Sequence, residues 1–281
     1  MKRQKYDEIG YWSEVKLDII KEYASAYTRI MAAQQAPSFS YIYIDAFAGS
    51  GRHISRRTHE FVSGSPLNAL NIENPFHEYH FIDLNDLKVA ELENIAGERE
   101  DVIIYHGDCN VILLERVLPL VEYAKYRRAL CILDPYGLHL NWEIIKTAGT
   151  MKSIEIFLNF PVMDINMNVL KHDQSKVDQE QIDRMNAFWG DESWRDIAYT
   201  KSKQKSLFGP EGEEKTTNEA LEAGFRRRLK DVAGFEYVPE PMPMKNSNNA
   251  IVYYLYFASQ KPAAKNIIKD IFKKYSDRRE N

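Results

Sequence analysis

Four aspartates stand where short apolar stretches of the sequence end. Asp45 ends YIYID, Asp83 ends YHFID, Asp108 follows VIIYHG and Asp134 follows RALCIL. Stretches of this length, rich in β-branched and aromatic residues, are typical of buried strands. Because the carboxyl ends of parallel strands meet at one edge of an open α/β sheet, we expect these carboxylates to lie together. Carboxylates in such a place can accept hydrogen bonds from the hydroxyl and amine groups of a ligand.

A glycine-containing loop, DAFAGSG (45–51), follows the first of these stretches. Gly49 and Gly51 lack a Cβ atom, so the backbone there can approach a ligand closely. A nicotinamide enzyme would favour G-x-G-x-x-G running straight into a helix. This loop has only G-x-G, and the segment RHISRRTHEFVSG (52–64) separates it from the next predicted helix. Alternatively, the glycines only shape a turn and the aspartates only cap helices. That alternative suits any single aspartate better than it suits the set of four.

The stretch LDPYG (133–137) resembles two methyltransferase motifs. One is the D-P-P-Y motif of enzymes that methylate amino groups of adenine or cytosine, and the closer one is the D-P-Y/F-G motif of tRNA guanine-N2 dimethyltransferases. Similarly, DAFAGSG resembles the D-P-F-x-G-S-G loop of DNA amino-methyltransferases. The resemblance implies that an exocyclic amine binds Asp134 and the carbonyl of Pro135, while Tyr136 stacks on an extruded base. One proline of D-P-P-Y is missing, which leaves the target open, and a simple Pro-Tyr-Gly turn is the alternative.

These resemblances imply S-adenosyl-L-methionine (SAM) as the cofactor. Asp83 would then bind the ribose hydroxyls, Asp108 the adenine amino group, and Asp45 the methionine end. The expected catalytic residues are Asp134, Pro135 and Tyr136. The expected cofactor-binding residues lie on the four strand ends: Asp45, Phe47, Ala48, Gly49, Ser50, Gly51, Asp83, Leu84, Asp108, Cys109 and Asp134. No metal is expected, because His77 and His80 have no third ligand nearby.

The elements that must position these residues form a regular alternation of apolar strands and helices. We expect one α/β domain over residues 1–281, with a doubly wound, Rossmann-like, mostly parallel sheet. Helical periodicity predicts an N-terminal helix at about 13–33. A partly helical insertion is expected at about 163–217. A C-terminal antiparallel hairpin and a last helix complete the layout, which is that of class I SAM methyltransferases.

The composition restricts the function classes. The chain has 281 residues, 44% hydrophobic and 28% charged, with a net charge of −4, so there is no global basic field for nucleic acid. Binding to nucleic acid would need a local patch, and Arg52, His53, Arg56 and Arg57 could contact phosphates there or form a solvated loop. Only two cysteines are present, and the sequence has no signal peptide or long apolar run, so a cytoplasmic location is expected.

The chain as a whole resembles the three-Cys-motif partner protein (TcmP) family. The matching stretches include WSEVKLDIIKEY, YIDAFAGSG, GSPLNAL, LDPYGLHLNWEII, IFLNFPVMDINMN and FRRRLKDVAGFEYVPEPMPMKN. The resemblance implies a class I methyltransferase-like fold and a partner protein with a three-cysteine motif, of the radical-SAM type. It leaves the substrate open. A non-catalytic partner role is therefore the alternative, in which Trp189 and Trp194 would be either a docking anchor or packing residues.

Overall fold

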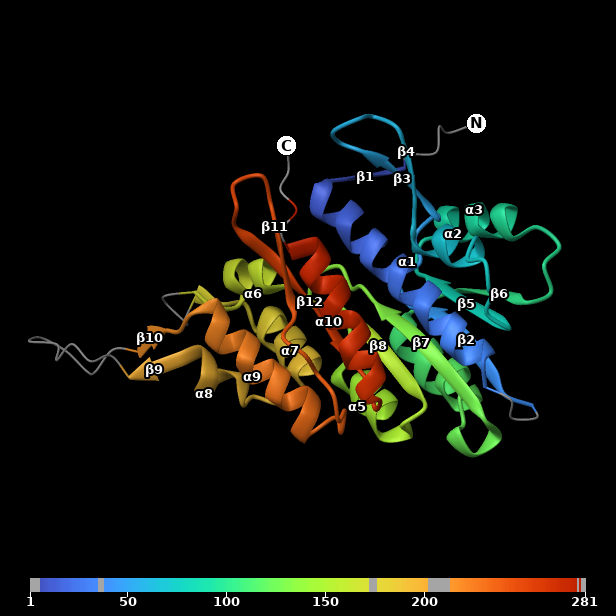
Figure 1. The fold of residues 1–281 in the computed structure, drawn as a ribbon. Coiled ribbons are helices and arrows are strands. Elements are labelled where there is room, and N and C mark those ends of the chain that lie inside the picture. The colour runs from blue at the N-terminus through green and yellow to red at the C-terminus, as the bar shows by residue number, and fades with distance from the viewer. Residues whose placement is uncertain (1–5, 35–37, 172–175, 202–212, 277, 279–281) are drawn as a thin grey trace, which may run out of the picture.

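The computed structural model describes residues 6–34, 38–171, 176–201, 213–276 and 278. A seven-stranded sheet in the order β11-β12-β8-β7-β2-β5-β6 forms its centre (Figure 1). Five of the strands are parallel, and they are β2 (Ser40–Asp45), β5 (Glu78–Asp83), β6 (Val102–His106), β7 (Arg127–Leu133) and β8 (Ile154–Phe160). Strand β12 (Ile251–Ala258) runs antiparallel to β8, and β11 (Met242–Lys245) antiparallel to β12. The predicted mostly parallel sheet with a C-terminal antiparallel hairpin is confirmed.

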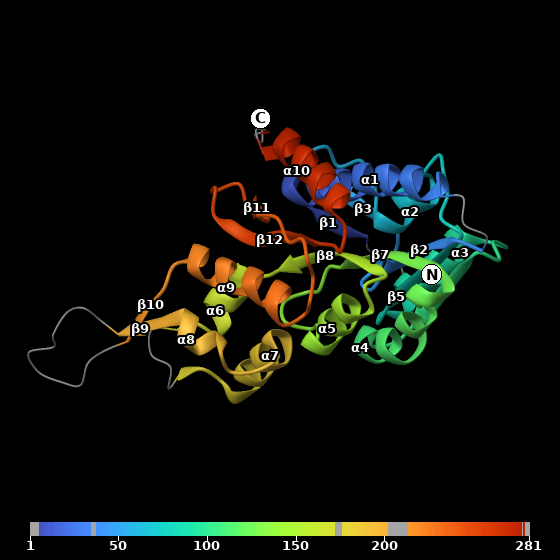
Figure 2. The ribbon, with the colours of Figure 1, turned by 60° about the horizontal axis from the view of Figure 1, so that its bottom comes forward.

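Helices cover both faces of this sheet (Figure 2). One face carries α1 (Tyr11–Ala32), α2 (Ser65–Leu70) and α10 (Pro262–Ser276). The other face carries α4 (Cys109–Ile112), α5 (Trp142–Met151) and α9 (Asn218–Asp231), with α6 (Val162–Asn168), α7 (Gln179–Trp189) and α8 (Trp194–Ala198) beside them. At the β5–β6 end lies α3 (Asp86–Ala96). This is the doubly wound α/β arrangement that the sequence predicts.

The two faces have separate apolar cores, because side chains alternate along each strand. In β2, Ile42 and Ile44 join the core under α4, α5 and α9, whereas Tyr41 and Tyr43 join the core under α1 and α10. Both cores contain packed rings: the ring centroids of Phe160 and Phe225 lie 4.6 Å apart in the first, and those of Tyr23 and Phe257 lie 4.6 Å apart in the second. The strands are thus held from both sides, which fixes the positions of their carboxyl ends.

A small second sheet, which the sequence did not predict, lies beside those carboxyl ends. Strand β1 (Asp7–Ile9) pairs in parallel with β3 (Arg52–Ser55), which pairs with β4 (Phe61–Ser63) as a hairpin. The segment RHISRRTHEFVS is therefore an ordered hairpin rather than a loop. It brings the N-terminal strand of the chain next to the glycine loop (Figure 1).

The expected N-terminal helix is present and begins at Tyr11, with Gly10 at its N-cap position. The helix after β6 differs more from expectation, since α4 continues as a π-helical turn (Leu113–Val117) and a 3-10 turn (Leu118–Leu120). Another 3-10 turn (Tyr123–Lys125) leads into β7. Pro119 accounts for the change, because it cannot donate a backbone hydrogen bond to continue the helix.

The segment 163–217 contains most of α6, then α7, α8 and the short antiparallel pair β9 (Tyr199–Lys201) and β10 (Glu213–Lys215). Its residues 172–175 and 202–212, including most of KSKQK and GPEG, lie outside the described residues. Trp189 and Trp194 are each 1% exposed and belong to the core that also contains β8. The suggestion that they form an exposed docking anchor is therefore wrong, and they are packing residues.

Candidate active site

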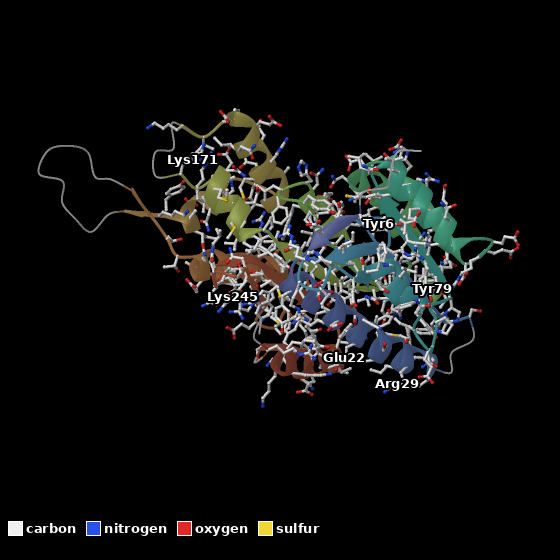
Figure 3. All side chains as sticks on the ribbon, turned by 90° about the horizontal axis from the view of Figure 1, so that it is seen from above. Tyr6, Glu22, Arg29, Tyr79, Lys171 and Lys245 are labelled. Carbon is white, nitrogen blue, oxygen red and sulfur yellow. The ribbon has the colours of Figure 1, made fainter. Side chains whose placement is uncertain are left out.

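A cavity of about 720 Å³ opens at the carboxyl ends of β2, β7 and β8. The glycine loop and the D-P-Y-G stretch form two of its walls, and β1 with the start of α1 forms a third. In the view from above, Tyr6 lies between the N-terminal strand and α3, and its hydroxyl donates to Glu91 at 3.3 Å (Figure 3). The residues that line the cavity include Asp7, Lys16, Phe47, Ala48, Gly49, His53, Arg56, Ser65, Asp134, Pro135, Tyr136, Asn159 and Tyr253.

Asp134 is joined to Lys16 by a hydrogen-bonded ion pair. The Lys16 side chain is 10% exposed and that of Asp134 is 31% exposed, so the carboxylate still faces the cavity. Burial alone would lower the pKa of Lys16, but the Asp134 charge, together with Tyr253, raises it above its ordinary value. Lys16 is therefore protonated at any physiological pH and places a positive charge beside Asp134.

Asp45 is completely buried below the glycine loop. Its Oδ1 accepts from the amide of Phe47 at 3.3 Å, while its Oδ2 has no partner among the described residues. Burial raises the pKa of Asp45 to about 7, with Asp134 and Asp83 adding to the rise and hydrogen bonds from Ser65 and Phe47 opposing it. Such an unpaired buried acceptor is rare in folded proteins, and Asp45 itself is not among the residues that line the cavity.

Two further buried polar atoms of the cavity wall lack a partner among the residues described. They are Oδ1 of Asn159, which follows Leu158 near the end of β8, and Nδ1 of His53 in β3. Burial lowers the pKa of His53, and the nearby Lys16 and Lys88 add to the effect while Asp7 and Asp134 oppose it. His53 is therefore neutral at pH 7. Because leaving such groups unpaired is unfavourable, the wall suits a polar ligand.

The glycine loop has the geometry that only glycine adopts easily. Gly49 and Gly51 have φ angles of 65° and 75°. A Cβ atom on Gly49 would point into open space, with His53 Cε1 at 3.9 Å as its nearest neighbour, whereas one on Gly51 would lie 3.2 Å from Ile95. The Gly49 amide donates to Asp83 Oδ2 at 2.8 Å, so the end of strand β5 fixes the loop after β2.

The remaining expected cofactor residues lie along the same sheet edge but outside the cavity wall. Asp83 also accepts from the Asn85 amide at 2.8 Å, and Ser50 donates to the Arg52 carbonyl. Leu84 is 72% exposed, and the exposed Asp108 accepts from the Asn110 amide as the N-cap of α4. Cys109 is buried, which raises the pKa of its thiol to about 12 and keeps it protonated.

The D-P-Y-G residues separate into a buried and an exposed part. Pro135 is buried in the cavity wall, and Gly137 has a φ of 62°. The Tyr136 ring is 64% exposed at the cavity rim, where its hydroxyl lies 3.4 Å from Asp7 Oδ2 and the Lys88 ammonium lies 5.4 Å from its centroid. An exposed aromatic ring at a cavity rim can stack on a planar ligand.

The basic residues of the hairpin lie differently from one another. Arg56 and Arg57 are exposed, Arg56 reaches the cavity, and the Arg57 guanidinium lies 5.9 Å from the Tyr11 ring. Arg52 points to Glu91 at 3.9 Å and does not line the cavity. The basic group suggested by the sequence is thus divided: His53 and Arg56 line the cavity, whereas Arg52 and Arg57 lie outside its lining.

Lys16 and Tyr253 line the site but were not predicted from the sequence. Lys16 and Tyr253 lie far from the strand-end motifs in the chain, and Lys16 stands at 5.2 Å from the Tyr253 ring centroid. Asn159 did carry a signal, because LNFP ends the fifth strand in the same way as LDPYG ends the fourth.

Comparison with known proteins supports the fold. The chain is similar to the crystal structure of protein LPL1258 from Legionella pneumophila, with a TM-score of 0.52, 12% identity and coverage of 92% of each chain. A candidate SAM-dependent methyltransferase from Listeria monocytogenes gives a TM-score of 0.39 at 12% identity, covering 85% of this chain and 98% of that one. A candidate methyltransferase from Thermobifida fusca gives 0.41 at 13%, covering 87% and 81%.

Identities this low concern the fold alone, and scores below 0.5 support no conclusion about function. No family model matches the sequence, and no curated protein is recognisably similar to it. Within the described part of the chain, no helix has the length and apolar character needed to cross a membrane.

Proposed function

We propose that this protein is a SAM-dependent methyltransferase that acts on an exocyclic amine of a nucleobase in RNA or DNA. The observation that supports this most strongly is that Asp134, Pro135 and the unpaired Asn159 Oδ1 share one cavity with the glycine loop at Gly49. A cofactor over the loop and an amine against Asp134 would be next to each other there.

The residues present fit SAM, which would supply an electrophilic methyl group when bound. Gly49 leaves open space for a ligand, and the unpaired Oδ2 of Asp45 could bind an ammonium directly or through water. Each Asp83 oxygen accepts one backbone hydrogen bond and retains capacity for a ribose hydroxyl. The exposed Leu84 and Asp108 flank the place where the adenine of SAM would bind, next to the ribose.

The acceptors around Asp134 suit an amine. Its carboxylate, the Pro135 carbonyl and Asn159 Oδ1 are all acceptors, and a neutral amino group offers two N–H donors with one lone pair left to react. Hydrogen bonds from both N–H groups to these acceptors would orient the lone pair toward the methyl group of SAM. Such alignment can supply much of the rate enhancement. In this arrangement the proton that the nitrogen must lose on methylation would pass to the Asp134 carboxylate.

The rim supports a polymeric nucleic acid as the substrate. Tyr136 offers a ring on which an extruded base can stack, and Arg56 and Arg57 lie on the hairpin beside the cavity. The resemblance to the TcmP family adds a three-Cys-motif protein as a proposed partner, located with this chain in the cytoplasm.

The test is to incubate the protein with radiolabelled SAM and separate pools of RNA and DNA, then digest the acceptors to nucleosides. We expect an N-methylated adenine, cytosine or guanine nucleoside from wild type and none from Asp134→Asn. Label in protein or in small molecules only, with none in either nucleic acid, would contradict the proposed substrate class.

A further inference from the structure

A second cavity, of about 380 Å³, lies at the opposite edge of the sheet from the candidate active site. It lies at the amino ends of β7 and β8, between the second half of α1 and the start of α10, with Arg128 and Glu155 in its wall. Figure 3 shows Glu22 and Arg29 along α1, away from Tyr6. None of the residues to which catalysis or cofactor binding is assigned contributes to it.

A buried polar group in this wall lacks a partner. The Tyr27 side chain is 3% exposed, and its hydroxyl has no hydrogen bond to any described residue. Tyr27 lines this cavity together with Glu155 and Arg128. Glu155 is already satisfied, because Tyr23 Oη donates to it at 2.5 Å and Ser259 Oγ at 2.9 Å. The Tyr27 hydroxyl differs from the Glu155 carboxylate in having no partner among the described residues.

The charge around this cavity is positive overall. Its lining contains three basic residues, Arg128, Lys152 and Lys261, and one acidic residue, Glu155. Lys152 and Lys261 are exposed at its mouth, and the 15-residue helix α10 begins directly after Lys261. The free amides of a helix N-terminus add a partial positive charge. The mouth therefore favours an anion.

The rest of the wall is apolar, with Ile30, Met31, Phe39, Ile154 and Ile267 among its residues. Such a combination of an apolar wall with a few convergent polar groups is typical of small-molecule sites. We propose that this second cavity binds a small amphipathic anion, with its rings or chain against the apolar wall and its carboxylate or sulfonate at Lys152, Lys261 and the start of α10. The proposal is independent of the activity proposed for the first cavity.

The test uses 2-naphthoate and its neutral isostere 2-naphthamide as probes in calorimetric titrations of the full chain. We expect saturable 1:1 binding of 2-naphthoate, about tenfold tighter than that of 2-naphthamide, because a paired charge strengthens a hydrogen bond. The variant Lys152→Ala with Lys261→Ala should weaken 2-naphthoate about tenfold. Its matched control, Lys269→Ala with Lys273→Ala, removes two charges from the exposed side of α10 and should leave the affinity unchanged.

A blocking variant, Ala263→Trp, locates the site. Ala263 is exposed at the mouth, so a large side chain there should fill the entrance without disturbing a core. Circular dichroism and the melting temperature confirm that it folds. We expect it to abolish 2-naphthoate binding. Four results would each overturn the proposal. They are retained 2-naphthoate binding in this variant, equal affinity for the two probes, equal effects of the two charge-removing pairs, and no saturable binding at millimolar probe.

Discussion

The ammonium of Lys16 in α1 binds the carboxylate of Asp134, which stands 118 residues later at the end of β7. This pair joins the N-terminal helix to the D-P-Y-G stretch at the wall of the candidate active site. In the function proposed above, Lys16 would be a positioning residue, because it contacts Asp134 and would act on the substrate through that carboxylate. The pair is also partly shielded from water, which makes its contribution measurable.

A double-mutant cycle should detect this coupling. We expect Lys16→Met and Asp134→Asn each to lower the free energy of unfolding, and the double variant to lose less than the sum, with a coupling of about 1 kcal/mol. The exposed Lys125–Glu122 pair, with exposed fractions of 67% and 46%, is the control and should show almost no coupling. Urea denaturation measures both cycles, and equal coupling in the two would contradict the role given to Lys16.

Asp134→Asn should separate binding from chemistry. The amide keeps the shape of the side chain but removes the charge that would accept the amine proton, so we expect kcat to fall by about 100-fold or more. The dissociation constant of SAM should change by less than about threefold. A variant with weakened SAM binding and unchanged kcat would place Asp134 on the cofactor instead of on the substrate.

Asp45 should make stability depend on pH. Its folded-state pKa of about 7 is raised above the ordinary value of 3.8, so the neutral carboxyl stabilises the fold fully below pH 3.8 and this contribution is lost as pH rises through 7. Between pH 5 and pH 7 the free energy of unfolding should therefore fall by about 2 kcal/mol more in wild type than in Asp45→Asn. Urea denaturation at these two pH values measures the difference, and identical slopes would contradict the raised pKa.

Gly49→Ala should weaken the binding of SAM. A Cβ atom there would occupy the open space assigned to the cofactor, and the positive φ adds about 1 kcal/mol of strain. Gly234 is the matched control: it has a φ of 83°, and a Cβ atom on it would meet nothing within 4 Å. Gly234→Ala therefore carries comparable strain away from the cavity wall and should bind SAM as wild type does. If Gly49→Ala also binds SAM as wild type does, the glycine loop does not hold the cofactor.

The hairpin arginines should contribute to nucleic-acid affinity. We expect Arg56→Ala with Arg57→Ala to weaken binding to single-stranded RNA or DNA and to lower the salt dependence, d log K/d log[salt], by about 2. Lys269→Ala with Lys273→Ala removes the same charge from α10 and should have little effect. Fluorescence anisotropy at several salt concentrations distinguishes the two. Equal losses would mean that the hairpin makes no specific phosphate contact.

The main sheet could be predicted from the sequence because each strand is a short apolar run and each run is followed by a helical pattern. The same logic placed Asp45, Asp83, Asp108 and Asp134 at one edge. The hairpin β3–β4 was missed, since RHISRRTHEF is polar and its pairing with β1 depends on the distant N-terminal strand. Lys16 was missed for a similar reason, because only the packing of α1 on the sheet brings its side chain to Asp134.

A calorimetric titration of the full chain with SAM tests the central claim most directly. We expect saturable 1:1 binding with a dissociation constant in the micromolar range, and weaker binding to Asp83→Ala, because that change also releases the Gly49 amide. Absence of binding at high micromolar SAM would contradict the proposed methyltransferase. The chain would then be better described as a non-catalytic, methyltransferase-like partner of a three-Cys-motif protein.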